Sequence, residues 1–211
     1  AKSEWLRARS APSIGARSGL NKIGVDRENN RINGFIVAQL GAFKSQGRGE
    51  FNQQALETIV QMGNQSAAGL KSHLAHATLS GDGIGTFLGR ASNYRLDNVS
   101  VTKDNVNTTL LAVRADLQLD ETAMKPTPKM HSAPGKYVMD LTESDPEALG
   151  ASLVLKIEEK YRQEPDGTLS KDADGETLPP LWFPTSLHGI DIVSVGDSTD
   201  AMLDATGLRD S

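Results

Sequence analysis

The chain contains no cysteine. This excludes a disulfide framework, a thiol nucleophile and a cysteine-ligated metal centre, and it is compatible with a reducing cytoplasm. Long apolar runs are also missing from the sequence. No stretch approaches the roughly 20 apolar residues that a membrane-spanning helix needs, so we expect no transmembrane helix and no membrane partner.

Positive charge is scarce as well. The chain has 22 Lys and Arg against 27 Asp and Glu, a net charge of -5 and a pI near 5.4. The basic residues are dispersed, whereas proteins that follow a phosphate backbone gather them in a stripe. We therefore expect no specific nucleic-acid partner.

The length and composition of the chain favour one domain with flexible ends. A chain of 211 residues, 37% hydrophobic and 23% charged, can bury one sizeable core. We expect a flexible N-terminal segment at residues 1–20, one domain at residues 21–204 and a short tail at residues 205–211. The basic start resembles a transit peptide but includes Glu4 and lacks an apolar helical face, which favours a mobile segment.

The first two thirds of the domain predict two hairpins and a helix. Strand-forming residues flank a turn at residues 28–30 and then a second turn at residues 103–105, with arms at 22–26, 31–40, 89–101 and 106–119. Asn52 is suited to cap a helix with Leu56, Ile59 and Val60 on its apolar face, and Gly63 to end it.

The last third predicts a short helix, two strands and a long loop. The helix lies around residues 137–141, Gly150 turns the chain into a strand at 152–157, and a final core strand spans 187–195. Residues 158–184 hold two glycines, four prolines and many acidic residues, which predicts an exposed, mobile loop that could cover a cleft as a lid. Trp182 and Phe183 would form a hydrophobic clasp on this loop.

Two of the four histidines, His73 and His76, lie three residues apart. On a helix they could share a face and hold a metal, but a catalytic zinc needs three protein ligands. Gly69 and the glycine-rich residues 81–85 instead favour strand and loop, where the two rings would point to opposite faces. A metal hydrolase is therefore the weaker alternative, and His131 and His188 are expected to be solvated.

Ser152 is a candidate nucleophile because it follows Gly150 and Ala151 into a strand. Hydrolysis of a peptide by a serine needs a base that takes the hydroxyl proton and a group that orients the base. Histidine and aspartate can supply these two roles. Such residues meet in space without a fixed order in sequence, so spacing alone does not select them.

The order of several short segments resembles that of the prohead proteases of tailed bacteriophages, whose fold is related to herpesvirus assemblin. Residues 69–76, 80–85 and 88–90 resemble the histidine region of that family. Further segments look like its strand, helix, serine and acidic-strand regions: 114–117, 137–138, 145–146, 150–154 and 191–193. The resemblance covers roughly residues 20–200.

The resemblance implies a mixed α/β fold, a largely antiparallel β-barrel with surrounding helices, like herpesvirus protease. It implies a serine endopeptidase that cleaves scaffold and major capsid proteins during prohead maturation and processes its own termini. The enzyme would need no cofactor, would work in the host bacterial cytoplasm inside the assembling prohead, and could form a homo-oligomer. A non-catalytic capsid-assembly or scaffold module of the same fold is the main alternative.

By the same resemblance Ser152 is the nucleophile, His76 the base and Asp191 the orienting acid. Two departures keep alternatives open. Ala77 stands where the family often has proline, which leaves His73 as an alternative base, and the polar residues 194–200 leave Asp140 or Asp116 as alternative acids. Three arginines, Arg90, Arg95 and Arg114, could stabilise an oxyanion, although ordinary ion pairing is the simpler expectation.

Overall fold

The computed structural model describes residues 6–9, 23–42, 49–74, 86–103, 106–126, 132–145 and 148–194. Within them the strands are β1 (Leu6–Arg9), β2 (Gly24–Asp26), β3 (Arg31–Gln39), β4 (Gly41–Ala42), β5 (Glu50–Phe51), β6 (Leu70–Leu74), β7 (Thr86–Lys103), β8 (Val106–Leu119), β9 (Leu149–Lys160) and β10 (Leu181–Ser194). The helices are α1 (Gln53–Gln65) and α2 (Pro134–Ser144). Neither helix in this part of the chain is long and apolar enough to cross a bilayer.

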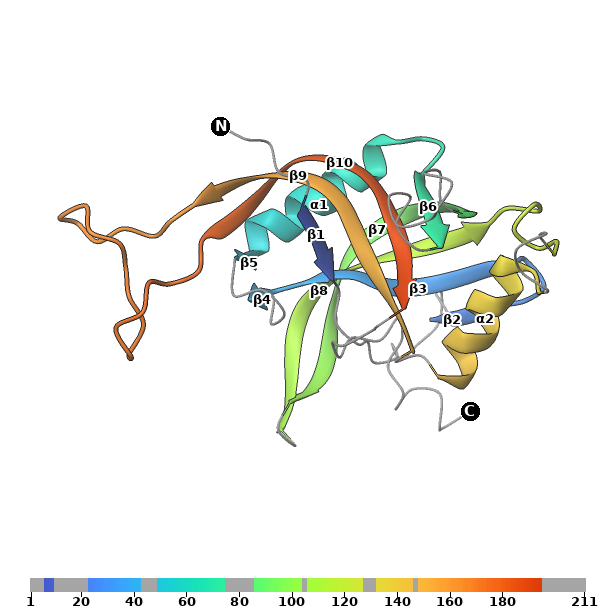
Figure 1. Ribbon diagram of the computed structural model, residues 1–211, viewed down its shortest axis with the longest axis horizontal. Helices are drawn as coiled ribbons and strands as arrows, with labels where there is room; N and C mark the ends of the chain where they lie inside the picture. The colour runs from blue at the N-terminus through green and yellow to red at the C-terminus, as the bar shows by residue number, and fades with distance from the viewer. Residues whose placement is uncertain are drawn as a thin grey trace.

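The strands form one open, curled sheet in the order β1-β9-β10-β6-β7-β8-β3-β2 (Figure 1). Along this path only the pairing of β10 with β6 is parallel; the others are antiparallel. The prediction of a mixed α/β, largely antiparallel fold is therefore confirmed. The prediction of a β-barrel is wrong, because the end strands β1 and β2 pair with one neighbour each and not with one another.

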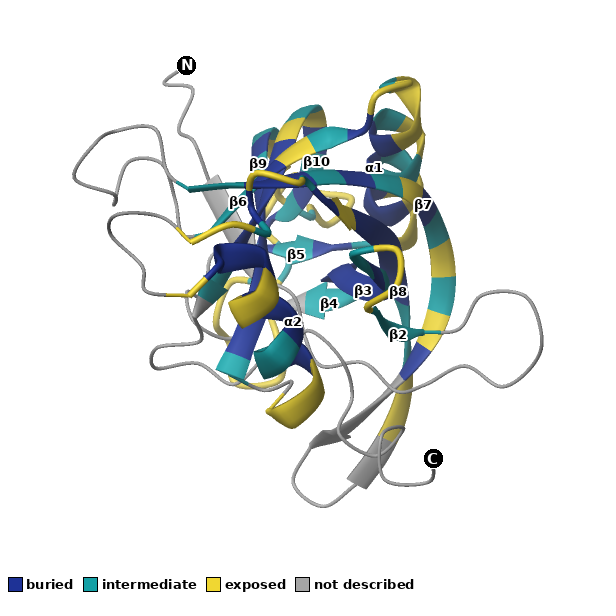
Figure 2. Ribbon diagram, turned by 90° about the vertical axis from the view of Figure 1, so that its right-hand side faces the viewer, coloured by how far each residue is buried: buried dark blue, intermediate teal, exposed yellow. Residues whose placement is uncertain are grey.

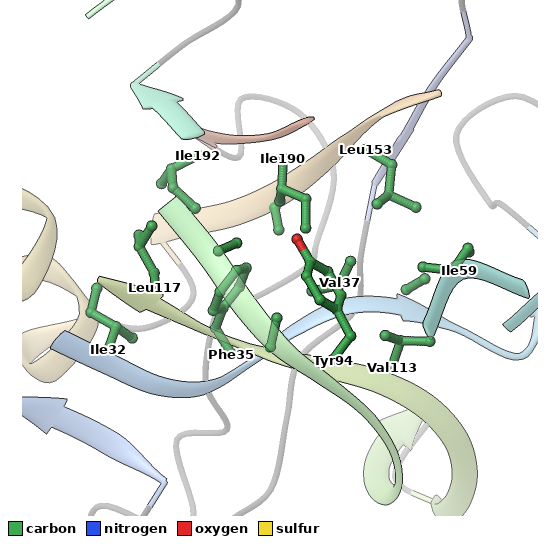
Figure 3. Packing of buried hydrophobic residues seen from close by; sticks show 14 of the residues in the cluster. Ile32, Phe35, Val37, Ile59, Tyr94, Val113, Leu117, Leu153, Ile190 and Ile192 are labelled. Atoms are coloured by element: carbon green, nitrogen blue, oxygen red, sulfur yellow. The ribbon is translucent and has the colours of Figure 1, made fainter. Parts of the chain in front are cut away.

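The core lies where the curled sheet faces itself (Figure 3). Ile190 and Leu153 project from β10 and β9 toward Phe35 and Val113 of β3 and β8, and all four are fully buried. Burying one such side chain stabilises a fold by about 1.5–3 kcal/mol. This packing holds β9 and β10 rigidly, so residues on their other face have fixed positions.

Helix α1 starts as the sequence predicts and continues past Gly63. The Asn52 side chain accepts a hydrogen bond from the Ala55 amide at 2.9 Å, which caps the first turn. Gly63 is not the stop: a β-carbon there would lie 2.4 Å from the ring of Tyr94 on β7. The glycine is needed so that the helix can approach this ring. The side of helix α2 that faces the sheet is buried (Figure 2).

Both predicted hairpins are present. Strands β2 and β3 pair around residues 27–30, and β7 pairs with β8 along almost its whole length. The second hairpin is longer than predicted because β7 begins at Thr86. Three irregularities interrupt the pairing of β8 with its neighbours: at residues 33–34 and at residue 37 of β3, and at residues 93–94 of β7.

The long loop is shorter than predicted, because β9 continues to Lys160 and β10 begins at Leu181. Between them the chain makes two tight turns closed by backbone hydrogen bonds, and it projects as an arm from the body of the protein (Figure 1). Trp182 is not a clasp on the loop but a buried residue of β10 that packs edge-on against Phe51. Its indole donates a hydrogen bond to Glu159.

Candidate functional site

Ser152, Asp191 and His73 form a row across three adjacent strands, β9, β10 and β6. Asp191 lies directly opposite Ser152 in the antiparallel β9–β10 pair. Strands β10 and β6 are parallel and pair Gly189 with Lys71, which brings His73 beside Asp191. The fold therefore gathers one serine, one carboxylate and one imidazole from segments that are far apart in the sequence.

All three side chains point away from the hydrophobic core. Successive residues of a strand face opposite sides of a sheet, and the neighbours Ala151, Leu153, Ile190 and Ile192 all belong to the core. The row is nevertheless shielded from solvent: Ser152 is 1% exposed and Asp191 4%, while the His73 side chain is 22% exposed. Solvent thus reaches the row chiefly at the imidazole.

The imidazole of His73 is held from two sides. Its Nδ1 lies 3.2 Å from Oδ1 of Asp191. The ring of Phe87, opposite His73 in the β6–β7 pair, meets the imidazole edge-on with 5.8 Å between ring centroids. Sequence reasoning did not single out Phe87, because its contact depends on the β6–β7 register. The carboxylate and the aromatic ring together orient the imidazole.

The hydroxyl of Ser152 is buried and has no hydrogen-bond partner among the residues that the structure describes. Most buried polar groups in proteins are paired, and an unpaired one costs about 1–3 kcal/mol. A strand position with neighbours such as Ala151 and Leu153 does not itself require a hydroxyl. The unpaired oxygen of Ser152 is therefore a feature that structure alone does not explain.

This arrangement supplies the groups of acyl-transfer chemistry but not yet the contact between nucleophile and base. In a serine–histidine–carboxylate triad the imidazole stands between the other two groups, whereas here Asp191 on β10 stands between Ser152 and His73. Ser152 and His73 stand two strand spacings apart, roughly 10 Å between backbones. Proton transfer between them would require the imidazole to turn toward Ser152.

The alternative acids are engaged elsewhere. Asp140 on α2 bonds to Lys136 and Arg27, and these two partners, Lys136 first, hold the pKa of its carboxyl below the usual value. Asp116 on β8 binds Arg31 and Arg95. Neither carboxylate contacts a histidine in these bonds, so Asp191 is the acid that the structure brings to an imidazole.

Of the remaining histidines, the structure describes only His188. His76, the predicted base, and His131 lie outside the described residues. His188 is exposed on β10 and pairs with the hydroxyl of Ser186, as expected for a solvated ring. Among the described side chains, no group of three or more His, Cys, Asp or Glu is placed to hold a metal ion.

The three arginines make ordinary structural bonds. Arg90 donates to the carbonyl of Gly69, Arg95 to Asp116, and Arg114 to Asp97 and to the carbonyl of Gly34. Surface pairing was the simpler of the two roles expected for them, but Arg114 is fully buried and Arg90 bonds to a backbone carbonyl.

The arm at residues 161–180 does not lie over the row. Ser152 is in the first third of β9, and the arm begins where β9 ends at Lys160, roughly 26 Å farther along the strand. Figure 1 shows the arm projecting beyond that end of the sheet. In the conformation described, the arm does not act as a lid on Ser152.

Comparison of the chain with protein-family models, with curated proteins and with solved structures gave no match.

Proposed function

We propose that the protein is a serine endopeptidase in which Ser152 is the nucleophile, His73 the general base and Asp191 the residue that orients the base. The observation that carries this proposal is the row itself: an unpaired buried hydroxyl beside a carboxylate that bonds to an imidazole. The resemblance favours His76 as the base. The contact between His73 and Asp191 supports the alternative that the sequence left open.

The mechanism follows from these three roles. His73 Nε2 takes the Ser152 proton while Oγ forms a bond to the scissile carbonyl carbon. Asp191 holds the proton on Nδ1 and stabilises the imidazolium. The proton then passes from Nε2 to the leaving amine as the C–N bond breaks, which gives an acyl-enzyme. A water molecule deprotonated by His73 releases the carboxylic acid and restores Ser152.

The substrates we propose are scaffold and major capsid proteins of a maturing phage prohead in the bacterial cytoplasm, with self-processing at the termini. Support comes from the ordered segments that resemble this protease family. Those segments supply β6, β7, β8, β9 and β10, the strands that surround the row. The same segments support a relationship to the herpesvirus-protease fold, here with an open sheet.

One observation favours the non-catalytic alternative, a capsid-assembly or scaffold module of the same fold. Ser152 is 1% exposed, and no hydrogen bond joins it to a histidine among the described residues. A serine that is permanently sealed in this way could not attack a substrate. The experiment must therefore test whether the hydroxyl reacts at all.

The test is covalent labelling by a fluorophosphonate probe, followed by mass spectrometry, together with cleavage of the cognate scaffold protein. Wild type should be labelled at Ser152. Ser152→Ala should lose labelling and at least about 10⁴-fold in cleavage rate, as expected when the nucleophile of a coupled triad is removed. Labelling of another residue, or cleavage by the variant, would remove Ser152 from the site.

Ser72 provides a matched control for this substitution. It is a fully buried strand serine whose hydroxyl also has no partner among the described residues, but it lies on β6 next to His73 and points to the core side. Ser72→Ala should be labelled and should cleave the scaffold as wild type does. Equal losses of labelling and cleavage in Ser72→Ala and Ser152→Ala would show a general structural effect and not chemistry at Ser152.

A second pair of variants separates the two candidate bases. His73→Ala should abolish cleavage while the protein remains folded, whereas His76→Ala should retain it. Activity in His73→Ala and its loss in His76→Ala would show that the base is His76. A strong chelator should leave the rate unchanged, because an imidazole activates the nucleophile without a Lewis acid. Loss of activity that zinc restores would favour a metal hydrolase.

A further inference from the structure

The N-terminal strand β1 pairs with the same strand that carries Ser152. The pairing is antiparallel, and its register joins Arg9 to Ser152, Ala8 to Leu153, Arg7 to Val154 and Leu6 to Leu155. Strand β1 therefore lies on the outer edge of β9, and one of its residues stands directly opposite the candidate nucleophile. The other edge of β9 is covered by β10.

This edge of β9 has the properties of a peptide acceptor. An edge strand presents N–H and C=O groups that pair with any extended chain laid against it. Residues 152–155 of β9 include the buried Ser152, Leu153 and Leu155, so the backbone of the edge is fixed by the core beneath it. A peptide on this edge gains its affinity from main-chain hydrogen bonds made beside Ser152.

An endopeptidase must hold its substrate in an extended form with the scissile carbonyl near the nucleophile. The edge of β9 next to Ser152 meets this requirement, and β1 fills it. We propose that this edge is the acceptor for an extended peptide substrate and that residues 6–9 occupy it as a built-in competitor, which makes the N-terminal segment autoinhibitory. The inference rests on the proposed endopeptidase function for its biological meaning, but the docking can be measured without any catalysis.

The antiparallel register gives a specific signature. Residues of such a strand alternate between positions whose N–H points to the partner strand and positions whose N–H points away. Of the neighbours Arg7 and Ala8, one therefore donates to β9 and the other does not. Proline removes the donor, so only one of Arg7→Pro and Ala8→Pro should break a ladder bond.

The experiment uses the full chain in the Ser152→Ala background, so that no peptide is cut. A fluorescein-labelled peptide with the sequence of residues 1–12 is titrated by fluorescence anisotropy. The parent should bind it weakly, because its own β1 holds the edge at a high effective concentration. One of the two proline variants should bind at least about tenfold more tightly, and the other should bind like the parent. If neither variant differs from the parent, or both bind tightly to the same extent, the inference is wrong.

The peptide provides an independent control. N-methylation of its Arg7 or Ala8 removes one N–H without changing charge, and binding to the responsive variant should be lost for one of the two and kept for the other. Equal binding of both methylated peptides would overturn strand pairing. Cleavage is then measured with Ser152 restored. Tighter peptide binding without any cleavage upholds the docking and overturns the endopeptidase, whereas cleavage that the proline substitutions do not accelerate upholds the endopeptidase and overturns autoinhibition.

Discussion

Two buried aspartates, Asp116 on β8 and Asp191 on β10, both lie on the side of the curled sheet that faces away from the core. Asp116 is 3% exposed and Asp191 4%. Asp116 accepts four hydrogen bonds, from the amide of Gly34 at 2.8 Å and from the side chains of Arg31, Asn93 and Arg95. Each of its carboxylate oxygens is thus paired with strong donors.

The partners of Asp116 reveal a structural purpose. The strand pairing is irregular at Gly34 of β3 and at Asn93 of β7. Asp116 accepts a hydrogen bond from the backbone amide of Gly34 and another from the side chain of Asn93. Arg114, two residues before it, donates to the carbonyl of Gly34 from the same face. Asp116 and Arg114 therefore fasten the bulges that let the sheet curl.

Asp191 has different neighbours. Its neighbours across the strands are an imidazole, which it contacts, and the hydroxyl of Ser152, which has no partner. A buried carboxylate with a structural role is surrounded by donors, as Asp116 is. A carboxylate beside an unpaired hydroxyl and a histidine is the pattern expected where groups are kept ready for a substrate. The difference distinguishes the structural carboxylate Asp116 from the row that we propose to be reactive.

The largest expected effect concerns Asp191. Asp191→Asn keeps the size of the side chain but replaces an oxygen acceptor by an amide, which can stabilise neither the required tautomer of His73 nor its imidazolium. Cleavage should fall by about 10³–10⁴-fold while the protein still unfolds cooperatively. The measurements are the scaffold cleavage rate and a thermal melt. Asp120→Asn, on the turn that follows β8, serves as the matched control and should cleave like wild type.

Asp116 should give the opposite result. Asp116→Ala leaves the buried amide of Gly34 and two arginines without their acceptor, so the free energy of unfolding should fall by about 2–4 kcal/mol. Arg31 and Arg95 retain some access to water, which limits the loss. Cleavage per folded molecule should be unchanged, as measured by urea unfolding and by the rate at low temperature. A folded variant that has lost cleavage would remove the distinction between the two aspartates.

The sequence predicted the individual strands and helices better than it predicted which strands pair with one another. Alternating residues in β8 and the Asn52 cap identify local structure, because they depend on neighbours along the chain. The pairing of β10 with β6, which brings His73 to Asp191, depends on the register between distant strands, and periodicity does not encode it. The sequence also could not show that Trp182 belongs to the core, because prolines surround it.

For the same reason, the sequence could not predict whether the sheet closes into a barrel. Strand periodicity is identical in an open sheet and in a barrel, and the difference depends on whether the first and last strands meet. Gly63 illustrates a third limit. A glycine near the end of a helix predicts a stop, whereas its use here is the close approach to Tyr94, a residue of another element.

A third unpaired hydroxyl, that of Tyr94, tests whether an unpaired group by itself indicates chemistry. It lies among the core side chains (Figure 3) and has no hydrogen-bond partner among the residues that the structure describes. Tyr94→Phe removes only this oxygen, so the free energy of unfolding at neutral pH should stay the same or rise by up to about 1 kcal/mol. Cleavage should not change. A loss of cleavage comparable to that of Ser152→Ala would show that unpaired hydroxyls do not distinguish the row.

The same substitution should change the response to alkaline pH. Burial raises the pKa of Tyr94 above its usual value, so the folded protein keeps the phenol proton at a pH where the unfolded chain loses it. Below about pH 9 both states are protonated and the group has no effect on stability. Above about pH 10 the unfolded state binds fewer protons, so stability should fall by up to about 1.4 kcal/mol per pH unit. Urea unfolding at pH 8 and pH 10.5 measures this fall, which should be smaller in Tyr94→Phe than in wild type. Equal falls in the two proteins would mean that the phenol reaches water in the folded state, and Tyr94 would then no longer serve as the buried, unreactive counterpart of Ser152.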